Sequence, residues 1–296
     1  MSLDIEIRTA TFNWLSQQLE THGDVLSRDL LRKGFKHREV RIPLVSPKGI
    51  FKPKSLDLPL TITTTANSPY KDSFTNDDLL LYKYRGTDPN HRDNVGLRKV
   101  KERGLPLIYF HGVVPGKYLA IFPVFIIDDN PEKLEFTVAA DDRKVIYDDL
   151  METSLVKEER RRYVTREVKA RLHQRGFRER VLKAYKEQCA FCHFKHINLL
   201  DAAHIVPDSE DEGTIEVQNG MALCKIHHAA FDQNIIGVTP DYEIKVRQDV
   251  LEEIDGPMLK HGIQEMHNQD LILPASKMNH SNKDKLAWRY EIFLNY

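Results

Sequence analysis

The three cysteines of the chain and one histidine stand at a spacing that suits a metal ion. Cys189 and Cys192 are separated by two residues, and Cys224 and His227 repeat that separation further along the chain. A pair spaced in this way can donate two ligands from a single tight turn, and tetrahedral zinc takes four thiolate or imidazole ligands. We therefore predict one structural zinc ion with four protein ligands and no open position for catalysis.

Two other interpretations of these cysteines stay open. They could be buried apolar residues beside a surface histidine, or Cys189 and Cys192 could form a redox pair. A redox pair would leave the second pair of residues unexplained, and an odd number of cysteines argues against a disulfide framework. We interpret the neighbouring His193 and His196 as surface residues.

Residues that could support hydrolysis lie between and after the two metal-binding pairs. His204 follows an apolar segment with a β-like composition, and we predict that a strand carries it. Asn219 precedes Cys224, while His228 and Asp232 are four residues apart and would share one face of a helix. The alternatives are a hydrogen-bonded core histidine at 204, a turn residue at 219, and a capping or ion-pairing carboxylate at 232.

The order His204, Asn219, His228, flanked by the paired zinc ligands, resembles the HNH endonuclease family and its ββα-metal fold over about residues 187–240. The resemblance implies hydrolysis of DNA phosphodiester bonds to 3′-hydroxyl and 5′-phosphate ends. It implies that His204 is the general base, that Asn219 orients it, and that His228 binds the catalytic divalent ion. An imidazole with an ordinary pKa of about 6.5 suits the first role. Asp232 would be a second ligand, and oxygen ligands favour Mg²⁺ or Mn²⁺.

One position departs from the family pattern. Many members carry a metal-binding His or Asp immediately before the base, and Ala203 stands there in this chain. Asp201 is the nearest carboxylate, but strand alternation points it away from the face that carries His204. The resemblance therefore leaves the catalytic metal shell incomplete, with Asp201 as a weak candidate ligand.

Residues 151–186 predict a basic helical connector. Twelve Lys or Arg and four Glu occur between residues 157 and 186. Cations along a DNA backbone add salt-dependent affinity for each phosphate they neutralise. We predict DNA contacts from Arg160, Arg161, Arg162, Arg166, Lys169, Arg171 and Arg175. The alternative is a solvated helix whose cations pair with Glu158, Glu159, Glu167 and Glu179, and Gly176 is a possible break in it.

Residues 1–150 predict a separate, β-rich domain. Two helices are expected over 4–34, followed by short β-like runs between 38 and 147 and a short helix near 94–103. Turn residues such as Ser46-Pro47-Lys48-Gly49 and Pro115-Gly116 separate the runs. The pattern favours a compact β-barrel or curved sheet, and the whole chain is predicted to be α+β.

The order of segments in this first domain resembles SRA-type readers of modified bases, which have a PUA-like barrel. The resemblance is carried by Tyr70-Lys71-Asp72, Leu81–Gly86, Asp93–Leu97 and Gly104–Ile108. It implies a pocket for a flipped, modified cytosine, and such a pocket needs a stacking ring and polar groups. Tyr70, Asp72, Tyr82 and Tyr84 are the candidates, although tyrosines in β-domains are more often core or sheet-face residues.

The bulk composition is that of a globular protein. The 296 residues are 41% hydrophobic and 29% charged with a net charge of −1, so total charge alone does not indicate nucleic acid. We find no apolar run long enough for a membrane span and no signal peptide, and therefore expect a cytoplasmic protein. The domains would be a reader (1–150), a connector (151–186) and a nuclease with a helical tail (187–296).

The sequence thus predicts a restriction-type endonuclease that cuts double-stranded DNA, directed at modified cytosine. Cutting both strands with one site per chain suggests a homodimer. One alternative is an HNH nuclease whose first domain senses another signal. The other is a non-catalytic DNA-binding protein in which zinc has only a structural role.

Overall fold

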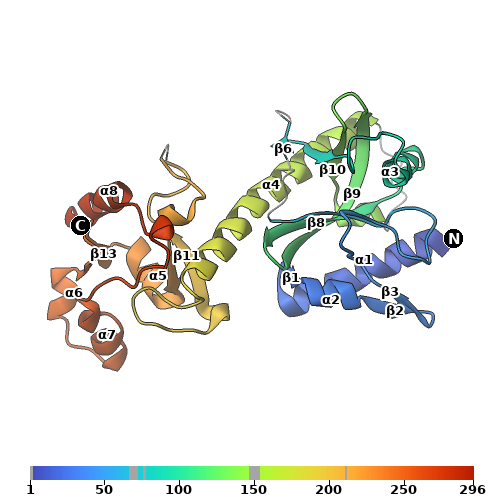
Figure 1. The fold of residues 1–296 in the computed structure, drawn as a ribbon. Coiled ribbons are helices and arrows are strands. Elements are labelled where there is room, and N and C mark those ends of the chain that lie inside the picture. The colour runs from blue at the N-terminus through green and yellow to red at the C-terminus, as the bar shows by residue number, and fades with distance from the viewer. Residues whose placement is uncertain (1–2, 67–72, 76–77, 147–153, 211) are drawn as a thin grey trace. The chain divides into compact units, whose positions relative to one another are not determined.

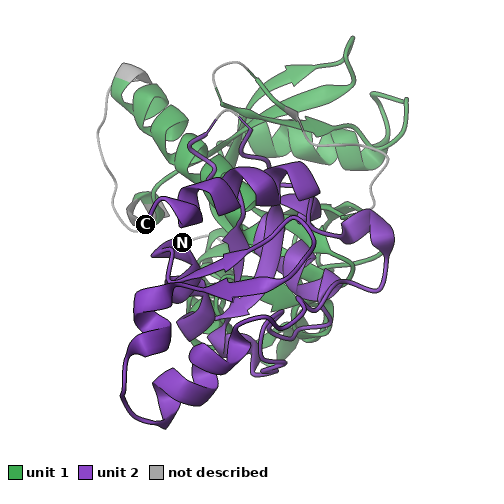
Figure 2. Cartoon of the chain, turned by 90° about the vertical axis from the view of Figure 1, so that its left-hand side faces the viewer, with its two compact units in different colours: residues 1–175 green, residues 176–296 purple. Residues whose placement is uncertain are grey.

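The computed structural model describes residues 3–66, 73–75, 78–146, 154–210 and 212–296, and the chain forms two compact units, 1–175 and 176–296 (Figure 2). The division falls after Arg175, inside the long helix α4 (Ser154–Ala184). The helix continues through Gly176 without a break, contrary to the possibility raised by the sequence. A Cβ at Gly176 would lie 2.9 Å from a guanidinium nitrogen of Arg180, so the glycine leaves room for that side chain.

The first unit combines short helices with one large sheet. Its helices before α4 are α1 (Leu3–His22), α2 (Arg28–Lys33), α3 (Arg92–Glu102) and the short 3-10 helix η1 (Arg143–Ile146). Its strands are β1 (Val25–Ser27), β2 (Phe35–His37), β3 (Val40–Ile42), β4 (Ile50–Phe51), β5 (Thr61–Thr64), β6 (Ser73–Phe74), β7 (Leu80–Lys83), β8 (Leu107–Val114), β9 (Lys117–Asn130) and β10 (Glu135–Ala140).

Strand β9 organises this sheet because it pairs with β1, β8 and β10 along its 14 residues. The order is β4-β5-β8-β9-β10-β7-β6, with β1 also on β9 and with β2 and β3 forming a separate hairpin. Strands β5 and β8 are parallel, and the other pairs are antiparallel. The sheet curls, as Figure 1 shows, so the predicted curved sheet with a short helix is confirmed.

Helices α1 and α2 form where the sequence supplies an apolar face and end signals. Helix α1 buries Ile7, Phe12 and Leu15 against the sheet. Ser27 caps the N-terminus of α2, and its side chain accepts a hydrogen bond from the backbone of Leu30, as N-cap serines do. It ends at Gly34, where φ is 58° and a Cβ would lie 1.9 Å from a backbone oxygen, so glycine is required.

The second unit is built from small elements around one core. Its strands are β11 (Leu200–His204), β12 (Gly220–Cys224), β13 (Ile236–Val238) and β14 (Ile244–Val246). Its helices are α5 (Lys225–Asp232), α6 (Gln248–Glu252), α7 (Pro257–Gly262) and α8 (Lys283–Leu294), with 3-10 helices η2 (Ile197–Leu199), η3 (Val217–Asn219), η4 (Gln264–Met266) and η5 (Lys277–Asn279). The predicted strand through residue 204 and the predicted C-terminal helix are confirmed.

Strands β11 and β12 pair in an antiparallel hairpin, and α5 follows β12 directly. His204 lies opposite Gly220 in this pairing. A Cβ at Gly220 would lie 2.6 Å from the ring of Phe177 on α4, so the glycine allows that ring to approach the hairpin. Over the residues that the structure describes, none of the helices has the length and hydropathy needed to cross a lipid bilayer.

Candidate functional site

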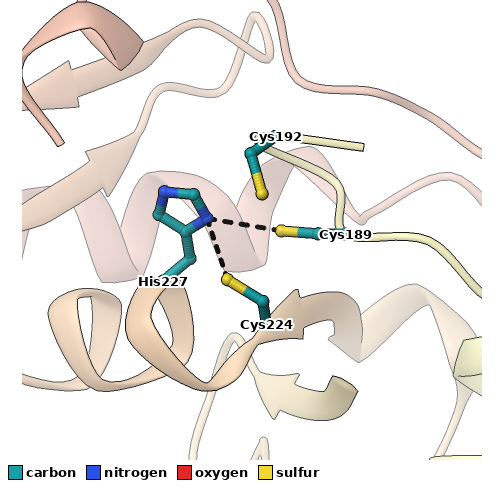
Figure 3. Close-up of side chains that lie close together, drawn as sticks. All are labelled: Cys189, Cys192, Cys224 and His227. Carbon is teal, nitrogen blue, oxygen red and sulfur yellow. Dashed lines mark hydrogen bonds between the residues drawn. The ribbon is translucent and has the colours of Figure 1, made fainter. Parts of the chain in front are cut away.

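The four residues of the predicted zinc site lie together in the second unit. The ligand atoms of Cys189, Cys192, Cys224 and His227 are all within 4.8 Å of one another, and their side chains point to a common centre (Figure 3). His227 Nδ1 lies 3.4 Å from Cys189 Sγ and 3.3 Å from Cys224 Sγ. Tetrahedral zinc–sulfur and zinc–nitrogen bonds place these atoms about 3.5 Å apart. The group can therefore hold a structural zinc ion.

The surroundings of this group also suit a metal. His227 Nε2 donates a 2.6 Å hydrogen bond to the backbone oxygen of Gly262, which fixes the tautomer that leaves Nδ1 free as a ligand. Hydrogen bonds from neighbouring thiols, that of Cys189 foremost, lower the pKa of Cys224. A thiolate is the form that binds zinc. The cluster joins the loop before β11 to the start of α5.

Two further atoms that could bind a metal ion belong to α5, and the first of them lies one residue after His227. His228 Nε2 is 3.3 Å from Asp232 Oδ2, across one turn of the helix. Two ligands at right angles on one divalent ion stand about 3 Å apart when each bond is about 2.1 Å. The His228 side chain is 24% exposed and that of Asp232 is 54% exposed, so solvent and a substrate can reach both.

His204 lies at the end of β11 against the ring of Phe177. The two ring centroids are 4.0 Å apart and the planes are inclined by 14°. Its Nε2 is buried and has no hydrogen-bond partner among the described residues. Burial lowers the pKa of His204, while Asp208 and Asp232 act to raise it and His228 to lower it further. A lowered pKa favours the neutral imidazole, which is the form that can accept a proton.

Asn219 is fully buried and ties together the segment that follows His204. Its Oδ1 accepts a hydrogen bond from Val206 N at 3.0 Å, and its Nδ2 donates to the backbone oxygens of Val206 and Thr214 at 2.9 Å each. Its own backbone oxygen accepts from Ile205 N. The asparagine thus fixes the chain directly after His204.

Asp201 lies on the other side of the His228 ring from Asp232. Its Oδ2 is 3.9 Å from His228 Nδ1, whereas Asp232 approaches Nε2. Arg178 and Lys225 both form ion pairs with Asp201. The pKa of Asp201 is lowered because these cations outweigh the effect of burial, which raises it. A single ion at Nε2 would not meet this carboxylate, so we leave Asp201 out of the proposed metal shell.

A family model described as HNH endonuclease matches residues 189–239, which span the cysteine–histidine cluster, β11, β12 and α5. The chain contains an HNH endonuclease domain. Nothing matches among the curated proteins. Two solved structures are similar to the chain, each with 14% identity and a TM-score of 0.28.

The first is a modification-dependent restriction endonuclease, TagI, aligned over 79% of this chain and 81% of its own. The second is the type IV phosphorothioation-dependent restriction endonuclease ScoMcrA, aligned over 69% of this chain and 53% of its own. TM-scores this low carry no information about the arrangement of this chain. The nuclease assignment therefore rests on the HNH domain.

Some residues that shape the HNH domain carry no signal in the sequence that would reveal their place. Phe177 reads as an ordinary packing position on a helix, yet it forms one wall beside His204. Arg289, 57 residues after Asp232, donates to the backbone oxygens of Phe231 and Asp232. Contacts between residues so distant in sequence depend on the tertiary fold.

Most of the basic residues on α4 already have partners within the first unit. Arg160 and Arg161 bind Asp141, and Arg166 and Lys169 bind Asp78. Arg162 also pairs with Glu158, and Arg175 pairs with Asp24. Arg171 lines a cavity, and its Nε is buried without a hydrogen-bond partner among the described residues. The carboxylates come mainly from the folded body of the unit rather than from glutamates of the helix.

The candidate base-pocket residues fall in two groups. Tyr70 and Asp72 lie outside the described residues. Tyr82 and Tyr84 are buried in a hydrophobic core, where Tyr84 bonds Asp129 and its ring packs on Phe136. These two tyrosines therefore take the core position that is usual in β-domains. Elsewhere in the unit, a cavity of about 720 Å³ is lined by α1, α4, the interior of β9 and the end of β10, and includes Phe122 and Arg143.

Proposed function

We propose that the protein is a metal-dependent DNA endonuclease in which His204 is the general base and His228 and Asp232 bind a catalytic Mg²⁺ or Mn²⁺ ion. The observation that carries this proposal is the 3.3 Å approach of His228 Nε2 to Asp232 Oδ2 on the exposed side of α5. A nitrogen and a carboxylate oxygen at this separation suit one divalent ion.

A divalent ion held there would polarise the scissile phosphate and stabilise the charge that develops on it. The residues of the chain then have separate tasks. His204, whose pKa is lowered by burial, would accept the proton of the attacking water. Asn219 would hold the segment after His204 in place through its three side-chain hydrogen bonds. The zinc group would fix the start of α5, next to His228.

Nicking of supercoiled plasmid with Mg²⁺ or Mn²⁺ tests this assignment. We expect His204→Ala and Asp232→Asn each to lower the nicking rate by about 100-fold or more, because each removes a group that acts in the transition state. His196→Ala is a matched control, since that histidine is exposed on the same unit. Equal inertness of the wild type and His204→Ala would favour a zinc-stabilised DNA-binding protein instead.

For the first unit we propose recognition of DNA that carries modified cytosine. The support is the resemblance of its segment order to SRA-type readers, together with a cavity whose volume, about 720 Å³, suits a small ligand or a base. The cavity is lined by residues other than Tyr82 and Tyr84. Because the predicted tyrosines do not line the cavity, a second candidate function is that the first unit responds to a signal other than modified cytosine.

Plasmids with and without cytosine modification separate these two candidates. Preferential cutting of modified plasmid supports the reader, and equal cutting removes it while leaving the nuclease intact. Whichever candidate holds, exposed cations on α4, such as Arg166, would contact the phosphate backbone of the DNA. One catalytic site per chain also leads us to propose a homodimer for cutting both strands, which sedimentation in the presence of DNA would test.

A further inference from the structure

The C-terminal helix α8 contacts two separate parts of the candidate catalytic site. It lies beyond the segment that matches the HNH family, which ends at residue 239. Asn282 caps the N-terminus of α8, where its side chain accepts hydrogen bonds from Asp284 N and Lys285 N. Leu286 and Phe293 anchor it, since both are buried, and a Cβ at Gly237 would lie 2.6 Å from the Phe293 ring.

Arg289 holds the end of α5. Its Nη2 donates to the backbone oxygen of Phe231 at 2.9 Å and to that of Asp232 at 3.3 Å. Its guanidinium carbon lies 4.9 Å from the centroid of the Phe231 ring. The last carbonyls of a helix have no partner within the helix and carry a partial negative charge. The Phe231 oxygen also accepts from Asn234 N at 3.1 Å, so the planar guanidinium adds a second donor there and a donor at the oxygen of Asp232.

Lys285 holds the loop on the other side of the site. Its Nζ donates to the backbone oxygen of Glu212 and, at 3.2 Å, to Thr214 Oγ1. Thr214 is also held by Asn219, because the Asn219 side chain donates to its backbone oxygen. One turn of α8 separates Lys285 from Arg289, so a single helix forms hydrogen bonds with both the loop after His204 and the end of α5.

We propose that α8 acts as a brace, by which we mean that Lys285 and Arg289 hold the loop at 212–214 and the end of α5 in place. Arg289 is then a positioning residue for the metal ligand Asp232. Asp232 is the last residue of α5, its side chain is 54% exposed, and a helix terminus is where the backbone frays most readily. The two hydrogen bonds from Arg289 hold that terminus, and thereby keep Asp232 Oδ2 beside His228 Nε2. This inference rests on the proposed function, since it requires Asp232 to bind the ion.

Metal binding by the zinc-loaded full-length protein tests the brace, with Mn²⁺ as the probe and electron paramagnetic resonance as the readout. Partners that orient metal ligands typically change affinity 10-fold or more, so we expect Arg289→Gln to weaken Mn²⁺ binding by about 10-fold. Arg289→Lys should recover part of the loss, because an ammonium can still donate to one carbonyl. Lys283→Gln is the control on the same helix, since Lys283 is exposed and pairs with Asp241.

Thermal melting and zinc content show whether each variant remains folded. The Asp232→Asn variant separates failure of the proposed metal site from failure of the positioning role of Arg289. If Asp232→Asn weakens Mn²⁺ binding and both Arg289 variants bind as the wild type does, the brace is overturned and the metal site stands. If Asp232→Asn binds Mn²⁺ normally, or the wild type binds none, the proposed metal site fails and the brace with it. If Arg289→Gln loses its zinc or does not fold, the folded Arg289→Lys variant decides the test. A Mn²⁺ affinity equal to that of the wild type then overturns the inference, and a weaker Mn²⁺ affinity supports it.

Discussion

The imidazole of His204 stacks on the phenyl ring of Phe177, with centroids 4.0 Å apart and planes inclined by 14°. Phe177 is 1% exposed and belongs to α4, whereas His204 ends β11. The ring excludes water from one face of the imidazole. This arrangement explains why burial is the largest cause of the lowered pKa of His204.

The pH dependence of nicking follows from this relationship. In the proposed mechanism His204 acts as a neutral imidazole, so the rate should rise as pH increases through the pKa of His204 and then level off. Because that pKa is lowered, the midpoint should lie below the ordinary value of 6.5. Phe177→Ala admits water beside the ring and should move the midpoint up towards 6.5, as rate profiles between pH 4.5 and 8 would record. Phe194→Ala, at a half-buried ring elsewhere in the unit, should leave the midpoint unchanged. A wild-type midpoint above 6.5 would contradict the assignment of His204.

Asn219 should contribute to stability as well as to activity. Asn219→Ala leaves the buried N and O of Val206 without their partner and removes the donor to the part-buried backbone oxygen of Thr214. An unsatisfied buried group costs about 1–3 kcal/mol, so we expect the free energy of unfolding of the second unit to fall by about 2–3 kcal/mol. Urea denaturation would measure the loss. Asn295→Ala, which removes one exposed bond to Glu291 O, should change little. Equal losses of the free energy of unfolding in the two variants would show that the hydrogen bonds of Asn219 do not stabilise the second unit more than an exposed bond does.

Removal of zinc should unfold the second unit and spare the first. Structural zinc contributes about 10 kcal/mol or more of binding free energy in small modules, and that energy is lost when the metal leaves. We expect chelation, or His227→Ala, to abolish one of two melting transitions in calorimetry. His193→Asn is the matched control, because His193 is exposed, lies beside the cluster and has a positive φ that asparagine tolerates. Two unchanged transitions after complete chelation would rule out a structural role for the metal.

Asp141 should make the first unit sensitive to acid. Its carboxylate accepts from Arg160 Nε at 2.6 Å and from Arg161 Nε at 2.8 Å. Burial raises its pKa, but the two arginines lower it more, so the folded value lies below the ordinary 3.8. The stabilisation is therefore complete above pH 3.8 and is lost as pH falls towards the lowered pKa.

Asp141→Asn should lower the free energy of unfolding of the first unit by about 3 kcal/mol at pH 7, because it removes the charged carboxylate that binds two partly buried guanidinium groups. It should also flatten the dependence of stability on pH in the acid range. Asp128→Asn provides the comparison, since Asp128 is 66% exposed and pairs only weakly with Lys101. Comparable losses in the two variants would mean that the Asp141 pairs do not hold α4 to the sheet.

Local pattern allowed much of the fold to be predicted. The helical spacing before residue 23, the β-like runs at 107–110 and 118–122 and the C-terminal helical segment each formed the expected element. The registers of β9 with three partners could not be predicted, because pairing between distant strands depends on which faces the packed sheet buries. The continuity of α4 through Gly176 was also decided by packing, since a single glycine lowers helix propensity by only about 1 kcal/mol.

In the HNH domain, some neighbouring site residues could be predicted from the sequence and others could not. Spacing alone determined each half of the zinc group and the pairing of His228 with Asp232, because two residues in one tight turn, or four apart on one helix, are neighbours in any fold. The two halves of the zinc group, Cys189 with Cys192 and Cys224 with His227, meet only in the tertiary structure. The tertiary structure decided that Asp201 faces the other nitrogen of His228, that Phe177 covers His204, and that the cations of α4 meet carboxylates of the sheet and loops. These contacts join residues from about 20 to about 90 positions apart, and only packing of the folded chain brings such side chains within reach of one another.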